Sequence, residues 1–211
     1  GKPLTAAGYT SEKWAQDFSA VTAAFQLKDI IYIGWSYGGT VPVDIISNIR
    51  PNPLKAIISL AAPTLGPGLQ IILTDINKAF SAGFLATNDS ILSLKTRTEF
   101  VNGCFARPET VPYTLKSEWV GFTVSQTPDI TALVLGRTQD STAFSAAGKA
   151  GLPLLVIGGT HDALANVTAL IKVMSEDFTN MESHLIPNQG HAIFYDDTSE
   201  TVRYITDYGE P

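Results

Sequence analysis

Cysteine is almost absent from this sequence, and charged side chains are scarce. Cys104 is the only cysteine among 211 residues, so no disulfide can form within the chain. Charged residues make up 16% of the sequence and hydrophobic residues 45%, which excludes a disordered chain and supplies a core. The 14 basic residues are outnumbered by 20 acidic ones, and no basic patch stands out. This balance argues against a nucleic-acid-binding protein.

Long apolar runs are also lacking. No run reaches the length of a transmembrane helix, and no signal peptide is visible at Gly1. With a single cysteine, these features favour the cytoplasm, although we expect the true N-terminus to be missing. Cys104 itself is predicted to be a small buried thiol, because the sequence around it offers no base. The length suits one domain with an inserted subdomain.

Short apolar runs alternate with helical patterns along most of the chain. Trp14, Phe18, Val21 and Phe25 recur at helical spacing and predict a helix over residues 10–27 with one apolar face. Strands are predicted at 30–33, 56–60, 154–157 and 182–186, and further helices at 37–49, 163–178 and 198–208. The first three strands are largely apolar, with Ser59 as the one exception, as is typical of strands buried on both faces. This alternation indicates an α/β fold with a parallel sheet.

Residues 64–147 interrupt the alternation. Gly66-Pro67-Gly68 opens this stretch, and no clean strand follows. Helices are predicted near residues 69–86, 88–101, 111–124 and 128–136. We interpret the stretch as a helical cap inserted above the carboxyl ends of the strands, where open α/β sheets bind ligands. The chain is thereby divided into a first core part (1–63), the cap (64–147) and a second core part (148–211).

The segment GWSYGG (residues 34–39) lies between a predicted strand and a predicted helix. It contains the pattern G-x-S-x-G, which in this context places a serine on a strained turn with its hydroxyl pushed out of the sheet. The glycines allow the strand and the helix to approach closely, and the helix N-terminus offers N–H groups to a developing oxyanion. Ser36 is therefore a candidate nucleophile, and an ordinary glycine-rich turn is the less favoured alternative.

Two further polar residues follow later strands. Asp162 comes after the strand at 154–157 and either orients an imidazole or caps the helix that begins near Ala163. His191 follows the strand at 182–186 and, taken alone, is equally consistent with a structural histidine. The order serine, aspartate, histidine, each just past a strand, belongs to one class of hydrolases. This order favours Ser36, Asp162 and His191 as a catalytic triad.

These motifs resemble those of the α/β hydrolases. GWSYGG (residues 34–39) is similar to the nucleophile elbow of the family, GGTHD (158–162) to its acid turn, and GHAIFYDD (190–197) to its histidine loop. The opening Lys2-Pro3 and the segment from Tyr9 to Phe25 are similar to the part of the family that comes after its early R-G-x-G-x-S segment. Within the family, the chain is most similar to capped serine esterases and non-haem haloperoxidase-like enzymes.

The resemblance implies a partial α/β-hydrolase fold with an inserted helical cap, and an esterase that needs no cofactor and no metal. The nucleophile elbow would include Gly34, Trp35 and Gly38, and the backbone N–H of Tyr37 would serve the oxyanion hole. A serine nucleophile disfavours epoxide hydrolases and haloalkane dehalogenases, because those relatives use an aspartate at this position.

Aromatic residues suggest an apolar pocket for a small-molecule ester. The candidates are Trp35 and, in the cap, Phe80, Phe84, Trp119 and Phe122. Phe100 and Phe105 belong to the same group of cap aromatics. For any one of these residues, packing between the cap helices is the alternative interpretation.

The sequence departs from the family pattern before Ile30. The family places about four strands ahead of the nucleophile strand, whereas the residues before Ile30 predict one helix. The loop that usually supplies the second oxyanion donor is missing as well. We therefore expect a fragment or truncated copy with weak or no activity. Residues 30–33 would then form an exposed sheet edge, open to an oligomer or a partner.

Two other functions stay open. One is a cofactor-free haloperoxidase or perhydrolase activity on the same triad. The other is a hydrolase-fold protein that binds a ligand without turnover, or an inactive pseudoenzyme. The complete triad argues against the second function, and the missing strands argue for it.

Overall fold

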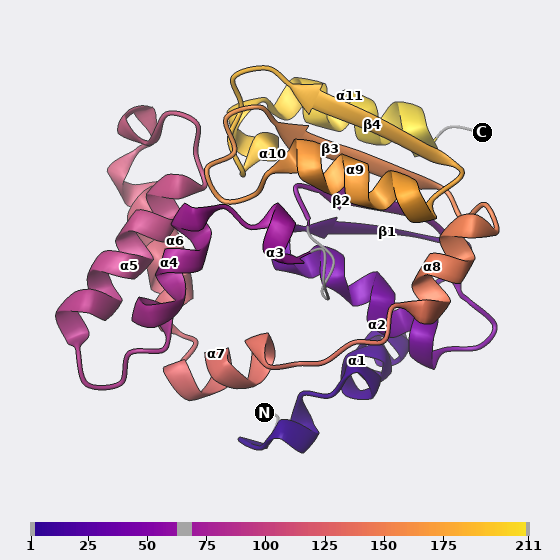
Figure 1. The fold of residues 1–211 in the computed structure, drawn as a ribbon, viewed down its shortest axis with the longest axis horizontal. Coiled ribbons are helices and arrows are strands. Elements are labelled where there is room, and N and C mark those ends of the chain that lie inside the picture. Colours follow the sequence, from indigo (N-terminus) through magenta and orange to yellow (C-terminus); the bar gives the residue numbers. More distant parts are fainter. Residues whose placement is uncertain (1–2, 63–68, 210–211) are drawn as a thin grey trace.

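A four-stranded sheet forms the centre of the computed structural model, which describes residues 3–62 and 69–209. The strands are β1 (Ile30–Trp35), β2 (Leu54–Leu60), β3 (Leu154–Gly159) and β4 (Met181–Ile186). They are parallel and lie in the order β1-β2-β3-β4 (Figure 1). The four predicted strands and the parallel arrangement are therefore confirmed.

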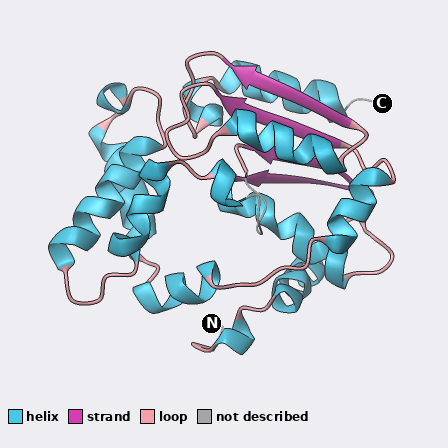
Figure 2. Cartoon of the chain, in the orientation of Figure 1, coloured by secondary structure: helices cyan, strands magenta, loops and turns pink. Residues whose placement is uncertain are grey.

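Helices surround the sheet and extend beyond its carboxyl edge (Figure 2). The α-helices are α1 (Ser11–Ala24), α2 (Val41–Asn48), α3 (Leu69–Ile72), α4 (Asp75–Phe84), α5 (Ser90–Gly103), α6 (Tyr113–Val124), α7 (Pro128–Leu135), α8 (Thr142–Lys149), α9 (Val167–Asp177), α10 (Ile193–Asp196) and α11 (Thr198–Gly209). Short 3-10 helices span Ala6–Gly8, Ser36–Thr40 and Pro108–Thr110. None of the helices within the described ranges is long and apolar enough to cross a membrane.

The central strands are apolar on both faces, and helices cover both. Leu154 and Val156 of β3 belong to a core cluster with α2, α8 and α9. Leu155 and Ile157, which alternate with them, pack on the other face against α11. All of β3 is buried, so the continuous apolar run correctly predicted a strand buried on both faces.

The burial predicted for both faces of β1 and for part of α1 was wrong, whereas the sheet edge expected at residues 30–33 is confirmed within the described sheet. β1 lies at one edge of the described sheet, and the side chains of Ile31 and Ile33 are 41% and 48% exposed. In α1, Val21 is 53% exposed and the neighbouring Phe25 is 72% exposed, so only the first half of the predicted apolar face is covered. Apolar periodicity predicted the elements themselves, but it could not show what packs against them.

The helices of the predicted insertion fall into two groups. α4, α5 and α6 lie together beyond the carboxyl ends of the strands (Figure 1) and share one apolar cluster. α8 instead contributes Phe144 to the core, where its ring meets that of Phe178 at 5.0 Å between centroids. We therefore propose that the cap ends before Thr142 rather than at residue 147. Its predicted start at residue 64, with the Gly66-Pro67-Gly68 segment, lies outside the described residues.

Backbone and capping contacts explain why two predicted helices have different bounds in the structure. The helix predicted over 69–86 is split into α3 and α4, because Leu73 forms a bridge to Ala165 and Thr74 caps the second helix. The helix predicted from residue 163 begins only at Val167, after the cap residue Asn166. The bridge joins segments that are distant in the chain, so helical periodicity could not predict it. The caps of Thr74 and Asn166 are local, each to an N–H group three residues on.

Candidate active site

The structure brings Ser36, His191 and Asp162 together at the carboxyl edge of the sheet. Nε2 of His191 lies 2.8 Å from Oγ of Ser36, and Nδ1 of His191 lies 2.8 Å from Oδ2 of Asp162. The side chains of His191 and Asp162 are 2% and 0% exposed. An imidazole bonded to a hydroxyl on one side and to a carboxylate on the other can take the hydroxyl proton and remain oriented while it does so.

Ser36 stands on a strained turn directly after β1. Its φ of 50° lies in the left-handed region, which a residue with a side chain seldom adopts. Strain of this kind is expected where a turn must present a nucleophile above a sheet. Tyr32 of β1 donates a 2.8 Å hydrogen bond from its hydroxyl to the carbonyl oxygen of Gly38 and so ties the turn to the strand.

The glycines of the candidate elbow, residues 34–39, differ in how much space surrounds them. A Cβ added to Gly34 would lie 2.8 Å from the Cα atom of Gly39, and one added to Gly39 would overlap the Cβ atom of Ala62. Among the described residues, a Cβ added to Gly38 would meet nothing within 4 Å. Close approach therefore requires glycine at Gly34 and Gly39. The sequence motif predicted Gly34 and Gly38 as the glycines of close approach and left out Gly39, although GWSYGG contains all three.

Asp162 has two structural tasks at once. Its Oδ1 atom accepts 2.8 Å hydrogen bonds from the backbone N–H groups of Leu164 and Ala165, while Oδ2 faces His191. The carboxylate thus closes the turn after β3 and orients the imidazole. The helix cap that the sequence offered as an alternative is provided by Asn166, which accepts from the N–H of Ala169.

The loop that carries His191 is held from several directions. Nε1 of Trp35 donates to the carbonyl oxygen of His191, and the N–H of Ala192 donates to the carbonyl oxygen of Cys104. Oδ2 of Asp196 accepts from the N–H groups of Gly190 and Ala106, at 2.8 and 3.0 Å. No role was predicted for Asp196, although it lies within the motif GHAIFYDD.

The predicted pocket aromatics do not all lie together. The ring of Trp35 is 5.4 Å from that of His191 and 5.8 Å from that of Trp119. Phe80 and Phe84 pack against Phe100, at 5.9 and 5.1 Å, in an apolar cluster that also includes Trp35 and Trp119. Phe122 is 66% exposed. Phe194, an aromatic residue that was not among the predicted pocket residues, has its ring 5.0 Å from that of Trp35. Its position three residues after His191 could have indicated that it lies near the site.

Cys104 lies near the triad but is chemically unsuited to be the nucleophile. Its side chain is buried, and burial, with the nearby carboxylates of Asp162 and Asp196, raises the pKa of the thiol to about 12. A thiol with such a pKa stays protonated at neutral pH, and the thiolate is the nucleophilic form.

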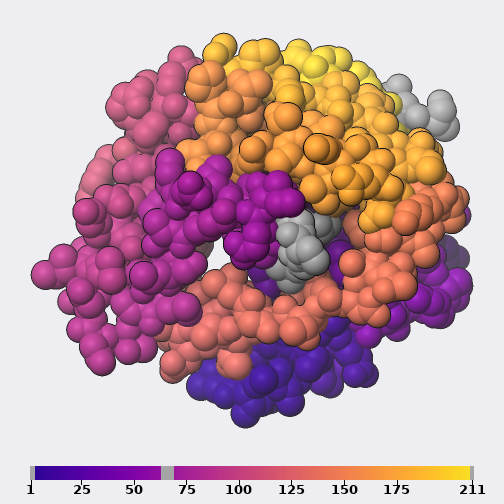
Figure 3. Space-filling view, viewed as in Figure 1, coloured from indigo at the N-terminus to yellow at the C-terminus, as the bar shows by residue number. Residues whose placement is uncertain are grey.

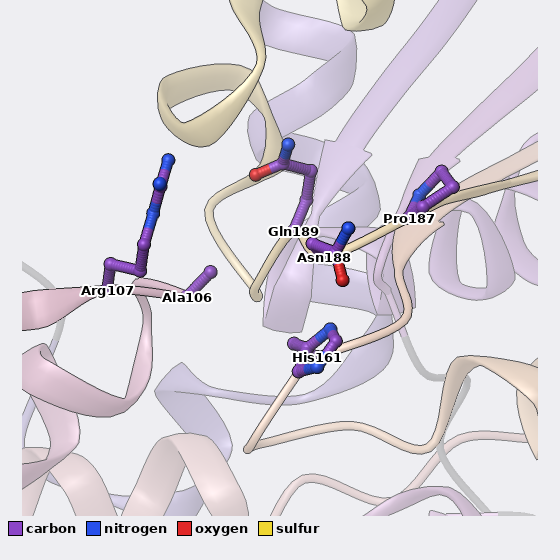
Figure 4. Close-up of a pocket in the computed structure, with 6 residues that line it drawn as sticks. All are labelled: Ala106, Arg107, His161, Pro187, Asn188 and Gln189. Atoms are coloured by element: carbon purple, nitrogen blue, oxygen red, sulfur yellow. The ribbon is translucent and has the colours of Figure 1, made fainter.

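Two cavities open beside the acid turn. The larger, of about 480 Å³, is lined by Ala106, Arg107, His161, Pro187, Asn188 and Gln189 (Figure 4). The smaller, of about 310 Å³, includes Asp162 in its lining but neither Ser36 nor His191. Separately, Figure 3 shows the surface hollowed between α7 and the segment that carries α3 and α4.

Over residues 3–62 and 69–209, no group of three or more His, Cys, Asp or Glu side chains is arranged to hold a metal ion.

Comparison with known proteins agrees with this architecture. The model of the alpha/beta hydrolase fold family matches residues 1–198. None of the curated proteins matches the sequence. A Burkholderia cenocepacia protein with an aryl esterase assignment is similar in structure, with a TM-score of 0.84 and 23% identity over 99% of this chain and 74% of that one.

Two further solved structures are similar. The esterase RhEst1 from Rhodococcus sp. ECU1013 has a TM-score of 0.82 and 22% identity over 94% of this chain and 71% of its own. A bromoperoxidase from Bacillus anthracis has a TM-score of 0.77 and 20% identity, covering 98% and 75%. At these identities the likenesses establish the fold and do not by themselves assign a reaction.

Proposed function

This chain belongs to the alpha/beta hydrolase fold family, and on that premise we propose that it hydrolyses carboxylic esters with Ser36 as nucleophile. The observation that carries the proposal is the pair of 2.8 Å contacts that link Ser36 through His191 to Asp162. The left-handed φ of Ser36 supports it, because a strand-to-helix turn that presents a nucleophile above a sheet adopts this kind of strain.

In the proposed reaction, Oγ of Ser36 bonds to the ester carbonyl carbon while Nε2 of His191 takes the hydroxyl proton. The tetrahedral intermediate then expels the alcohol oxygen, which leaves with that proton. Water, deprotonated by His191 in the same way, cleaves the acyl-enzyme, releases the acid and restores Ser36. Asp162 keeps Nδ1 of His191 protonated and stabilises the imidazolium that forms in each half.

The negative oxygen of each intermediate needs preorganised donors. We propose the backbone N–H of Tyr37 as one of them. It is the one donor that we assign among the described residues, and the loss of one donor typically slows such reactions ~10²–10³-fold. We therefore expect weak turnover by this chain, and covalent labelling of Ser36 is the more sensitive assay.

We place the apolar end of the substrate near Trp35, whose ring lies 5.4 Å from that of His191, and near Trp119, whose ring lies 5.8 Å from that of Trp35. We infer that Phe80 and Phe84 mainly pack the cap, because both rings meet that of Phe100 edge-on. Phe122 is 66% exposed, so we assign it no part in the pocket. An apolar wall of two indoles suits small or medium acyl or aryl esters.

The test is labelling with a fluorophosphonate, whose phosphorus bonds to the serine oxygen as fluoride leaves. Intact-mass measurement should show one adduct on the wild-type chain and none on Ser36→Ala. Hydrolysis of p-nitrophenyl esters from acetate to laurate by the same two proteins measures turnover and acyl preference.

A folded wild-type chain that takes up no label and does not exceed Ser36→Ala in turnover would contradict the proposal. Tight binding of an ester by both proteins without turnover would instead favour a hydrolase-fold binding protein.

A further inference from the structure

A buried charged group links the end of the cap to the nucleophile elbow. Arg137 follows α7 in the connection that runs past α2 and α1 toward α8 (Figure 1). Its side chain and that of Asp44 in α2 are both 0% exposed, with 3.4 Å between Nη2 and Oδ2. The proposed triad chemistry uses neither residue.

Arg137 reaches the backbone of the elbow through one hydroxyl group. Nη2 of Arg137 donates a 2.6 Å hydrogen bond to Oγ1 of Thr40, and that hydroxyl donates a 2.7 Å bond to the carbonyl oxygen of Tyr37. Thr40 ends the short helix that begins at Ser36. A guanidinium group, a hydroxyl and the carbonyl of the residue after Ser36 therefore form one continuous chain of hydrogen bonds.

The side chain of Tyr37 is fixed from the same direction. The guanidinium of Arg137 lies 5.2 Å from the centre of its ring, and its hydroxyl donates a 2.6 Å bond to the carbonyl oxygen of Val134 in α7. Gln139 adds a 2.8 Å bond from Nε2 to the carbonyl oxygen of Thr40. The cap exit, residues 134–139, thus holds Tyr37 by its carbonyl oxygen, its ring and its hydroxyl.

This cluster is poorly suited to a purely stabilising role. Nε and Nη1 of Arg137 are buried without a hydrogen-bond partner among the described residues, and burial raises the pKa of Asp44. Removing two charges from water often costs as much as their attraction returns. A buried pair with unused donors is therefore better explained by the geometry that it imposes.

We propose that Arg137 is a positioning residue that acts through Thr40 and Tyr37 to hold the oxyanion-binding N–H of Tyr37. The inference rests on the proposed function, because it concerns the same site. Rotation of the Tyr37 backbone would move its N–H away from the oxyanion, and the contacts to its carbonyl and ring oppose that rotation. The same contacts fasten α7 of the cap to the elbow, so the cap exit and the oxyanion donor move together.

The test compares two matched pairs of variants by their rate of fluorophosphonate labelling at Ser36. Thr40→Val keeps the shape of the side chain but removes the bridging hydroxyl, whereas Thr40→Ser retains it. Arg137→Lys keeps a positive charge but loses the planar fork and its contact with Tyr37. Arg97→Lys is its control, since Arg97 is also a buried arginine but binds the cap carbonyl oxygens of Thr123 and Gln126.

We expect the maximal labelling rate of Thr40→Val and Arg137→Lys to fall about tenfold or more, short of the ~10²–10³-fold cost of a lost donor. The probe concentration for half-maximal rate should stay within about twofold of wild type, because the groups that bind the probe are unchanged. Thr40→Ser and Arg97→Lys should react within about twofold of wild type. Amide hydrogen exchange in residues 37–41 should be faster in the first two variants only.

Melting temperatures must show that each variant is folded at the assay temperature; if Arg137→Lys is not, the Thr40 pair carries the test. A wild-type chain that takes no label would contradict the proposed function and this inference with it. A labelled wild type, with folded Thr40→Val and Arg137→Lys reacting at its rate, would contradict the inference alone.

Discussion

Nε1 of Trp35 donates a 2.9 Å hydrogen bond to the backbone carbonyl oxygen of His191, across 156 positions of sequence. The residue directly before the proposed nucleophile thus holds the loop of the proposed base. The two rings lie 5.4 Å apart, and Phe194 packs edge-on against the indole. The distance between Ser36 and His191 is therefore set by a side chain that touches both segments.

Trp35→Phe should separate this positioning role from a role in substrate binding. The phenyl ring retains much of the apolar packing but cannot donate to the carbonyl oxygen of His191. We expect kcat for a p-nitrophenyl ester to fall about tenfold, the order of one lost hydrogen bond, while KM stays within about twofold. Steady-state kinetics on the two proteins measure both constants.

Trp119→Phe is the comparison variant for Trp35→Phe. Within residues 3–62 and 69–209, Trp119 makes ring contacts with Trp35 and Phe105 and no side-chain hydrogen bond to the loop of His191. If Trp119 lines the pocket, its replacement should raise KM and leave kcat nearly unchanged. A rise in KM for Trp35→Phe with unchanged kcat would show that the indole N–H does not position His191.

Asp162→Asn and Asp162→Ala should have different effects on stability and similar effects on catalysis. Asparagine can still accept from the N–H groups of Leu164 and Ala165 through its Oδ1 atom, whereas alanine leaves both without a side-chain acceptor. Either change removes the carboxylate from Nδ1 of His191, and we expect kcat to fall about 10⁴-fold.

Thermal melts of these two variants should show that Asp162→Ala is the less stable, by about 1–3 kcal/mol for the lost acceptor. Equal melting temperatures would mean that the two backbone contacts contribute little to the turn. A kcat close to wild type in Asp162→Asn would rule out the orienting role.

The sequence predicted the parts of this site that depend on neighbours in the chain. GWSYGG between a strand and a helix located Ser36, and the apolar runs located β2 and β3 as buried strands. Because parallel strands all end at one edge of the sheet, residues just after them were expected to meet there. Ser36, Asp162 and His191 do so.

Contacts between distant segments could not be predicted from the sequence. The bond between Arg137 and Thr40 spans 97 positions, and no local pattern marks Arg137 as anything but a solvated arginine. Likewise, periodicity cannot tell whether a neighbour covers Ile31 or Phe25, both of which are exposed. The crowding at Gly39 depends on Ala62, so a one-dimensional motif favoured Gly38 instead.

Asp44 should make stability depend on pH in a recognisable direction. Burial raises the pKa of its carboxyl above the usual 3.8, and the nearby polar groups of Gln139 and Ser11 together with the charge of Arg137 oppose the rise only in part. Because the pKa of Asp44 is raised in the folded protein, the contribution of this carboxyl to the free energy of unfolding is fully present below the pKa that it has in the unfolded chain. It is lost as the pH rises through the folded value.

The amide side chain in Asp44→Asn cannot ionise, so this variant should not lose stability as the pH rises through that range. We expect the melting temperature of Asp44→Asn relative to wild type to increase between about pH 4 and about pH 7, even if the variant starts lower because Arg137 has lost its partner. Thermal melts of both proteins across this range test the slope. A difference that stays constant or decreases would show that Asp44 does not titrate above its ordinary value.

Gly39→Ala and Gly38→Ala provide a test of the elbow geometry itself. A methyl group on Gly39 would overlap the Cβ atom of Ala62, a buried residue just after β2, so either the turn or the strand end must shift. Overpacking of this kind typically costs about 1–3 kcal/mol. A methyl group on Gly38 meets nothing within 4 Å among the described residues, and the backbone there is not left-handed. The free energy of unfolding of Gly38→Ala should therefore change by no more than ~0.5 kcal/mol.

Urea denaturation of the two variants measures these free energies, and fluorophosphonate labelling reports whether Ser36 is still presented. If Gly39→Ala is destabilised and slow to label while Gly38→Ala resembles wild type, close packing of the elbow on β2 sets the position of Ser36. If the two variants behave alike, the approach of Gly39 to Ala62 relaxes without consequence, and the strain at Ser36 alone must hold the hydroxyl above the sheet.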